Sequence, residues 1–485
     1  MLRVTLMHVA KPRNLLIFFV IIVSACGGGG GDKSGVSKSS SSASIVKLGG
    51  KITFDFVPHN LNFVGLNYGA TESRPVRGAV VEILDNTNQI KASTNTAADG
   101  TYSVTVPQNI DLKVRVKAQL LKTSSPSWDF KVTDNTSNNA LYVLEGALAS
   151  TGSTNSIRNL HANSGWDGTA YTNIRSAAPF AILDSIYTGV IKLESAGNSQ
   201  NLSPLELRWS TKNSTADGDY TKGEIETSFY DGDAIYILGS ANNDTDEYDP
   251  HILLHEWAHY VEVELSRSDT IGGDHSDDAP LDMRVAMSEG FANAFSGMAI
   301  NNPNYADALG VAQTSGFTFD IARKARSNKG YFSEGSIGSI FYNFYASSES
   351  KLANDFTPIF KILNSFSYYA NDAMTSIYLF YAQLKIQLPE YSVLLQTLLN
   401  EQAIWGVDEY ASMESNSGGL AIQLPVYKKL DVNNTPLNIC SSNQYGEQNK
   451  LGNSQFIRVN ILQAGAYTFN IVKSGGSLTS SNPEF

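Results

Sequence analysis

Two histidines and a glutamate between residues 250 and 262 have the spacing of a metal site. The sequence from His251 to Glu262 predicts a helix, and His255 and His259 would project from one face of it, one turn apart. Two imidazoles placed in this way can bind one zinc ion. Glu256 would lie about 100° round the helix, near enough to reach a metal-bound water without becoming a ligand. This HExxH pattern predicts Zn²⁺ at the histidines and Glu256 as the general base; the alternative is two helix histidines packed in a core.

A third ligand must come from elsewhere in the chain. A metzincin would have glycine at position 262 and histidine at position 265, but these positions are Glu262 and Leu265, which excludes that class. A second predicted helix carries Glu289, and the residues around it are small, so this face can approach the first helix closely. A carboxylate on such a face is costly unless it meets a cation. We therefore expect Glu289 to be the third ligand.

Other acidic or histidine side chains could compete for this role. Glu262 lies one turn after His259, but it would be strained toward a metal already bound by its own helix, and it is more often a solvated charge. The remaining rivals lie in the loop from Ser266 to Asp282, which should run beside the metal: Asp274, His275, Asp277 and Asp278.

These residues together resemble the gluzincins, the zinc endopeptidases that include thermolysin and fungalysin. The resemblance implies that His255, His259 and Glu289 bind zinc and that Glu256 acts as base in the hydrolysis of peptide bonds in proteins or peptides. In that family a carboxylate often stands four residues after the third ligand and supports a zinc histidine. Here that residue is Asn293, which can still accept a hydrogen bond but adds no charge.

Three residues are candidates for stabilising the charge that develops on the substrate. His275 could donate a hydrogen bond to a tetrahedral intermediate, although a solvent-exposed loop histidine is the commoner outcome. Tyr331 and Tyr342 lie in a stretch similar to the helix that follows the third ligand in fungalysin-like enzymes. The strand at 235–237 resembles the edge strand on which this family binds its peptide, and an ordinary internal strand is the alternative.

Asp249 and Pro250 are suited to the N-cap and the first position of the zinc-binding helix. The acidic run from Asp244 to Asp249 has residue types that also suit Ca²⁺, but helix capping accounts for it, and nothing else in the sequence supports calcium.

The first 25 residues are predicted to be an export signal. Basic residues precede the apolar run Leu15–Val23, which is too short to span a bilayer as a helix. The small residues that end this run before Cys26 resemble the lipobox of bacterial lipoproteins. The resemblance implies cleavage, lipidation of Cys26 and anchoring to a membrane of the bacterial cell envelope, facing the periplasm or the surface; Gly27 favours the outer membrane in a diderm cell. An ordinary signal peptide with a chance cysteine is the alternative.

The predicted fold class is multidomain α+β. Residues 26–44 are a Gly/Ser tether. Strand-period alternation over 45–148 predicts a β-sandwich that resembles the carboxypeptidase-regulatory-like module in the motifs at 75–81 and 96–102. Residues 149–428 are assigned to a zincin-type peptidase domain, with a mixed sheet and a helical lobe that includes helices at 355–366 and 373–388. Residues 429–485 are predicted to form a short C-terminal β segment, with strands at 455–462 and 466–472.

The charge balance restricts the partners. The 485 residues include 47 Asp and Glu against 35 Lys and Arg, for a net charge of −12, so no nucleic-acid partner is expected. We expect protein or peptide substrates and a membrane reached through the lipid at Cys26. Two other classes stay open: a zinc-binding but inactive envelope adhesin or scaffold, and an HExxH hydrolase that acts on a substrate other than a peptide.

Overall fold

The computed structural model describes residues 44–277, 279–348, 352–432, 435–461, 463–470 and 472. Contacts divide the chain into two units, of which Ala43–Lys428 with Asn438–Ile457 contains nearly all the described elements. Among the described residues, the second unit contains 429–432, 435–437, 458–461, 463–470 and 472. The predicted signal peptide, Cys26 and the tether up to residue 43 lie outside the described residues. None of the described helices is both long and apolar enough to span a bilayer.

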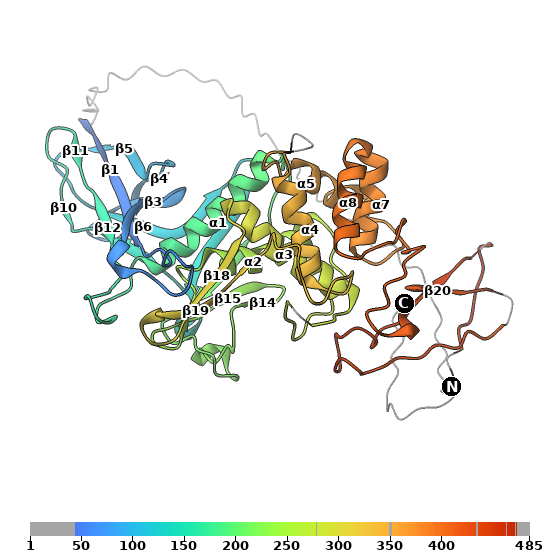
Figure 1. Cartoon of the computed structure of the whole chain (residues 1–485). Helices are drawn as coiled ribbons and strands as arrows, with labels where there is room; N and C mark the ends of the chain where they lie inside the picture. Colours follow the sequence, from blue (N-terminus) through green and yellow to red (C-terminus); the bar gives the residue numbers. More distant parts are fainter. Residues whose placement is uncertain are drawn as a thin grey trace, which may run out of the picture. The chain divides into compact units, whose positions relative to one another are not determined.

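Helices and several sheets make up the described part, a mixed arrangement of the α+β kind (Figure 1). A five-stranded sheet is centred on β1, which pairs with each of the other four strands. Side chains of β1 and β5 alternate between buried and exposed positions, the pattern of a strand with one face on a core. The members of this sheet are β1 (Ile45–Phe56), β2 (Glu72–Pro75), β5 (Thr101–Pro107), β11 (Ser156–Ile157) and β12 (Leu160–Ala162).

A ten-stranded sheet runs in the order β14-β15-β13-β7-β6-β3-β4, and β8, β9 and β10 pair with β7 or β6. Its members are β3 (Ala79–Asp85), β4 (Ile90–Asn95), β6 (Asp111–Lys122), β7 (Trp128–Asp134), β8 (Ala140–Leu141), β9 (Val143–Glu145), β10 (Ala149–Ser150), β13 (Leu205–Trp209), β14 (Phe229–Tyr230) and β15 (Ala234–Ile237).

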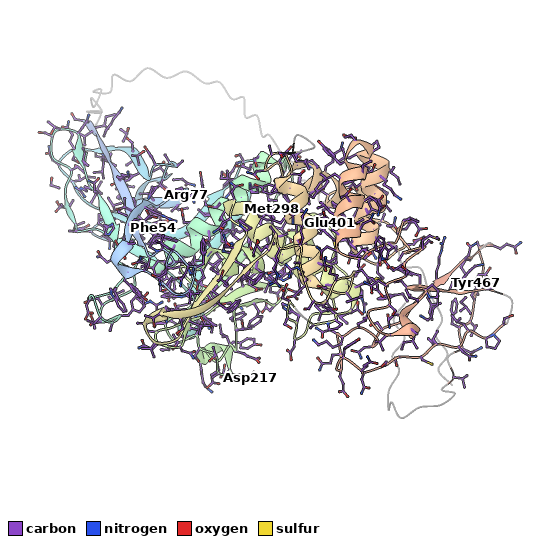
Figure 2. All side chains as sticks on the ribbon, in the orientation of Figure 1. Phe54, Arg77, Asp217, Met298, Glu401 and Tyr467 are labelled. Atoms are coloured by element: carbon purple, nitrogen blue, oxygen red, sulfur yellow. The ribbon has the colours of Figure 1, made fainter. Side chains whose placement is uncertain are left out.

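This sheet crosses the predicted domain boundary at 148/149. Strand β7 pairs in parallel with β13, with Phe130 opposite Leu205 and Val132 opposite Leu207. The hydrophobic core is also continuous, because Phe54 on β1 and Met298 on α3, both labelled in Figure 2, are fully buried in the same cluster. Residues 45–148 form strands in two sheets, as the alternation predicted, but they share a ladder and a core with the segment that follows.

Helices cover this framework and carry the residues of interest. Helix α1 packs on β6 and β7, and α3 packs between α2 and α4 (Figure 1). The α-helices are α1 (Ala178–Ser195), α2 (Pro250–Leu265), α3 (Met283–Ile300), α4 (Glu334–Ala346), α5 (Thr357–Leu363), α6 (Phe366–Tyr369), α7 (Ile377–Gln387) and α8 (Ser392–Glu401). The 3₁₀ turns are η1 (Tyr68–Ala70), η2 (Asn135–Ser137), η3 (Tyr220–Lys222), η4 (Val311–Gln313), η5 (Pro389–Tyr391) and η6 (Ala421–Gln423).

Helix α3 is buried from Met283 to Ala299. The small residues around Glu289 let the neighbouring helices pack closely against it. A side chain added at Gly290 would place its Cβ only 2.5 Å from Ile337 Cβ on α4, so glycine permits the close approach of the two helices.

A four-stranded sheet has the order β16-β17-β18-β19. Its first two strands precede α2 in the sequence, and its last two follow α3. Its strands are β16 (Gly239–Ser240), β17 (Asp244–Thr245), β18 (Asn304–Leu309) and β19 (Ser315–Asp320).

The C-terminal segment is only partly strand. β20 (Tyr427–Leu430) and β21 (Phe456–Val459) form a two-stranded sheet. The strand predicted at 466–472 is absent over the described residues 466–470, which have no regular structure. The helices predicted at 355–366 and 373–388 are present as α5 and α7 within shorter bounds.

Candidate metal centre

Helix α2 carries the two predicted histidine ligands and begins at Pro250, as the sequence predicted. Asp249 occupies the N-cap position, as predicted, but its side chain makes no capping hydrogen bond. One carboxylate oxygen of Asp249 lies 2.6 Å from His59 Nε2, and the other accepts a hydrogen bond of 3.1 Å from the Ala308 N–H. Two partners from distant segments therefore occupy this carboxylate.

Helices α2 and α3 bring three ligand atoms together. His255 Nε2 lies 3.2 Å from His259 Nε2 and 3.2 Å from Glu289 Oε2, and His259 Nε2 lies 3.3 Å from the same Glu289 oxygen. These three side chains form a group that could hold a metal ion. They are the residues predicted as ligands from the sequence.

Residues of α3 contact the other ring nitrogen, Nδ1, of His255 and of His259. Asn293 Oδ1 lies 3.0 Å from His255 Nδ1, where it can accept the N–H of that ring. His259 Nδ1 lies 3.1 Å from Ser288 Oγ, and the Ser288 hydroxyl donates to Glu262 Oε2 at 2.5 Å. With Nδ1 protonated in both rings, each Nε2 keeps a free lone pair that faces the other ligands.

Glu262 is therefore not the solvated charge that the sequence suggested. Its side chain is only 5% exposed, and its carboxylate lies behind His259, 3.6 Å from Nδ1, rather than among the ligand atoms. Residue Ser288 was missed because a serine beside the third ligand has no spacing rule of its own. Only the contact between the two helices reveals its role.

Glu256 lies at the edge of the ligand group. One of its oxygens is 3.9 Å from His255 Nε2, and the other accepts a hydrogen bond of 3.0 Å from the backbone N–H of Tyr230 on β14. The Glu256 carboxylate is thus oriented by backbone, with one oxygen left toward the metal group.

His275 lies at the same site. Its Nε2 is 3.4 Å from Glu289 Oε2, and its Nδ1 is 2.8 Å from a carboxylate oxygen of Glu334, the first residue of α4. Burial disfavours the imidazolium, but the hydrogen bond to Glu334 and the charge of Glu289 outweigh this and raise the pKa of His275 to about 9. Glu334 was missed by sequence reasoning because it lies 59 residues beyond His275.

The charges within this group stabilise an ionised Glu289 beside protonated histidines. Burial opposes the charge of Glu289, yet the facing His259, His255 and His275 hold the pKa of that carboxyl well below its usual value. Burial also opposes the charge of His259, while Glu289 and Glu262 raise the pKa of that imidazole well above its usual value. A bound cation would satisfy the same carboxylate.

The two predicted tyrosines are not brought to this group by their described contacts. Tyr331 packs against Phe332 and Tyr378 with a buried hydroxyl, and Tyr342 packs against Tyr345. A different tyrosine, Tyr305 on β18, lies edge-on to a ligand, with its ring centroid 6.2 Å from that of His255. Its position is set by β18, the strand after α3, which was not predicted from the sequence.

The rival ligands in the loop have other roles. Asp277 pairs with Arg326 and lies 3.6 Å from Arg323, and Asp274 is exposed. Asp278 lies outside the described residues.

The predicted edge strand is internal. β15, which contains 235–237, lies between β13 and β14 in the ten-stranded sheet. The short strand β14 is the edge, and its antiparallel register places Phe229 opposite Tyr236. A two-residue strand is too short for alternation to be recognised in the sequence.

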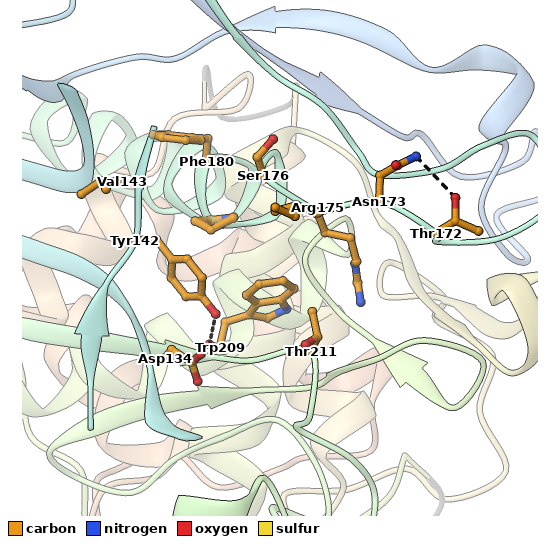
Figure 3. Close-up of a pocket in the computed structure, with 12 residues that line it drawn as sticks. Asp134, Tyr142, Val143, Thr172, Asn173, Arg175, Ser176, Phe180, Trp209 and Thr211 are labelled. Atoms are coloured by element: carbon orange, nitrogen blue, oxygen red, sulfur yellow. Dashed lines mark hydrogen bonds between the residues drawn. The ribbon is translucent and has the colours of Figure 1, made fainter. Parts of the chain in front are cut away.

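A separate cavity of about 510 Å³ lies elsewhere in the same unit and includes none of the metal group. Figure 3 shows Tyr142 and Trp209 side by side in its wall, with ring centroids 5.5 Å apart, and Arg175 beside them.

No protein-family model matches the chain, and no curated protein matches it. The arrangement of the site itself carries the functional inference.

Proposed function

We propose that the chain is a zinc-dependent peptidase whose zinc ion is held by His255, His259 and Glu289. The mutual distances of 3.2, 3.2 and 3.3 Å among their three donor atoms support this assignment. A tetrahedron with zinc–ligand bonds of about 2.0–2.1 Å has edges of about 3.3–3.4 Å, so one ion fits between these atoms. Two imidazole nitrogens and one carboxylate oxygen are also a donor set typical of catalytic zinc.

Three protein ligands leave one tetrahedral position for water, which separates catalytic zinc sites from structural ones. Bound zinc would polarise the substrate carbonyl and lower the pKa of that water toward about 7. Glu256 is positioned to take the proton, since one oxygen is fixed by the Tyr230 N–H and the other points toward the ligand group. The same carboxyl then delivers a proton to the leaving amine.

His275 is suited to stabilise the negative charge that develops on the carbonyl oxygen. The Glu334 carboxylate lies 2.8 Å from its Nδ1 and favours the protonated ring, whose Nε2 can donate a hydrogen bond. Glu334 would act as a positioning residue, because it touches His275 and none of the ligand atoms.

The edge strand beside the base favours an extended peptide over a small ester as the substrate. The backbone of β14 contacts Glu256 directly, and its outer edge is the end of the ten-stranded sheet. An extended peptide could pair with backbone groups of this edge other than the Tyr230 N–H, which Glu256 accepts, and this would bring its scissile bond close to the base.

We also propose, from the sequence, that the chain is exported and anchored to the bacterial cell envelope by lipid on Cys26. A Cys26→Ser variant should leave the membrane fraction and lose labelling by fatty acid. Retention of both by this variant would contradict the anchor.

The variant Glu256→Ala tests the proposed activity. It should retain one equivalent of zinc and lose about 10²–10⁴-fold in turnover of a peptide library, because only the base is removed. Glu264→Gln on the same helix is the control and should behave like the wild type. Undiminished turnover in Glu256→Ala would contradict the mechanism.

Two outcomes for the wild type would favour the other classes. Bound zinc with no turnover of any substrate would indicate a scaffold. Hydrolysis of esters or epoxides but not of peptides would indicate a different hydrolase.

A further inference from the structure

Three aspartates form a compact group on the four-stranded sheet, apart from the zinc ligands. Asp244 begins β17, Asp246 follows that strand, and Asp307 lies on β18, which pairs antiparallel with β17. Asp244 and Asp246 are two residues apart in extended chain and so share a face. One carboxylate oxygen from each aspartate lies within 4.8 Å of the other two.

Each of these aspartates has one buried carboxylate oxygen with no hydrogen-bond partner among the described residues. Oδ1 of Asp244, Asp246 and Asp307 is in each case inaccessible to solvent and makes no hydrogen bond. Asp246 as a whole is only 3% exposed, and its second oxygen accepts a hydrogen bond from the Ser228 hydroxyl. Buried carboxylate oxygens without partners are costly, so each calls for a proton or a cation.

The guanidinium of Arg175 is directed to the other face of the same segment. Thr245 and Glu247 alternate with the aspartates, and both accept hydrogen bonds from Arg175, which Figure 3 shows beside Trp209. Arg175 thereby balances Glu247. In the part of the chain that the structure describes, no Lys, Arg or His forms an ion pair with Asp244, Asp246 or Asp307.

The fourth nearby carboxylate is already balanced. Asp249 pairs with His59 and accepts the Ala308 N–H, so it contributes repulsion to the group but is not available to it. Burial and the neighbouring acids raise the pKa of Asp307 to about 8 and that of Asp244 to about 6. These three carboxyls repel one another when they are ionised together, and a divalent cation bound between them would remove that repulsion.

We propose that Asp244, Asp246 and Asp307 bind a calcium ion. Only oxygen atoms are offered, and carboxylate oxygens suit hard cations, whereas no nitrogen or sulfur is present to favour zinc. Calcium–oxygen distances of 2.3–2.6 Å allow oxygens around one ion to stand up to about 5 Å apart, which accommodates this group. Carboxylates can bind in bidentate fashion, and backbone carbonyls and water complete the six to eight ligands.

Such an ion would join two segments that flank the zinc ligands. Asp246 lies shortly before α2, which carries His255 and His259, and Asp307 lies on the strand after α3, which carries Glu289. Calcium would therefore connect the segment that precedes α2 to the strand that follows α3. The inference concerns a second ion and does not depend on peptidase activity.

Calcium titration of the full-length chain tests this site. The protein is freed of metal on a chelating resin, reloaded with one equivalent of zinc and titrated with CaCl₂ by calorimetry, with zinc content followed by elemental analysis. We expect one calcium per chain, a rise in Tm on adding CaCl₂ and at least a 100-fold loss of calcium affinity in Asp307→Asn. Asp217→Asn, an exposed aspartate labelled in Figure 2, is the matched control and should bind calcium as the wild type does.

Several results would overturn the proposal. These are the absence of calcium binding with an unchanged Tm, wild-type affinity in Asp307→Asn, and magnesium binding as tight as calcium binding. Asp307→Asn relieves repulsion and should fold without calcium; if it does not, Asp244→Asn provides the same comparison. Calcium binding should persist in His255→Ala, which lacks a zinc ligand, and its loss there would assign the ion to the zinc group instead.

Discussion

Ser288 on α3 donates a hydrogen bond of 2.5 Å to the Glu262 carboxylate on α2. The same hydroxyl oxygen lies 3.1 Å from His259 Nδ1, so it can accept the N–H of that ring while it donates to Glu262. These two hydrogen bonds connect the buried Glu262 carboxylate through one hydroxyl to His259, a member of the candidate metal-binding group. They fix the ring so that Nε2 faces His255 and Glu289.

Loss of this hydroxyl should weaken zinc binding. Ser288→Ala removes both hydrogen bonds without adding volume, and residues that support metal ligands in this way are typically worth about 10–100-fold in metal affinity. We expect a loss of that size, measured by competition with a zinc chelator.

Ser185→Ala is the matched control for this variant. Ser185 is buried on α1, and among the described residues its hydroxyl bonds to a carbonyl of its own helix alone, so its loss should leave zinc affinity unchanged. Equal affinities of the two variants would show that the Ser288 hydroxyl does not support His259.

The pair formed by His275 and Glu334 should affect turnover rather than metal binding. His275→Gln should lower kcat by about 10²–10³-fold, the usual cost of removing one donor to a developing oxyanion. Glu334→Gln should lower kcat in the same direction but less, because the amide oxygen can still accept from Nδ1. Kinetics and zinc content are measured together, with the exposed Glu390→Gln as control. A rise in KM at constant kcat would assign the pair to substrate binding instead.

The backbone N–H of Tyr230 provides an unusual test, since proline removes it. Tyr230→Pro eliminates the hydrogen bond to Glu256, and the β14 edge should otherwise persist because this N–H points to the carboxylate. A hydrogen bond to a charged group contributes about 1.5–3 kcal/mol, so kcat should fall by about 10–100-fold. Tyr230→Ala loses the ring but keeps the N–H and serves as the reference. Equal kcat for the two variants would show that this bond does not orient the base.

His251 should make the fold sensitive to acid. It is buried on α2 with its Nε2 3.2 Å from the Asn302 carbonyl, and burial lowers its pKa from 6.5 to about 4. Between these values the unfolded chain binds a proton that the folded chain does not, so stability is full above pH 6.5 and is lost as the pH falls toward 4. At pH 5 this residue should account for roughly 2 kcal/mol of lost stability.

The measurement compares urea unfolding of the metal-free protein at pH 7 and pH 5. His251→Gln keeps a donor to Asn302 and should reduce the difference between the two pH values by about that amount. The same pH dependence in wild type and variant would exclude His251 as the source.

The group of three side chains that could hold a metal ion was predictable from the sequence because its rules are local. His255 and His259 share one helix, and the small residues around Glu289 reported a close helix contact within one turn. Asn293 was predicted only through the resemblance to the gluzincins, in which a carboxylate often stands four residues after the third ligand. Glu334 and Tyr230 could not be found in this way, since one comes from the start of a distant helix and the other acts through its backbone.

The same distinction applies to the fold. Alternation identified β1, β5 and β6 because each has one buried face. It did not show that β7 pairs with β13, because that parallel ladder joins segments more than 70 residues apart and parallel pairing leaves no hairpin turn to recognise. The edge position of β14 was missed for a related reason, since sheet order is a long-range property.

The ladder between β7 and β13 restricts how such a chain could arise or be dismantled by recombination. A cut at 148/149 would leave β13 with an unpaired edge and expose Phe130 and Leu207, both fully buried in the intact sheet. An exposed edge of this kind invites aggregation. The N-terminal strands therefore cannot be exchanged as an independent unit. A segment from a homologue could replace them only if it also supplied a strand that pairs with β13 as β7 does.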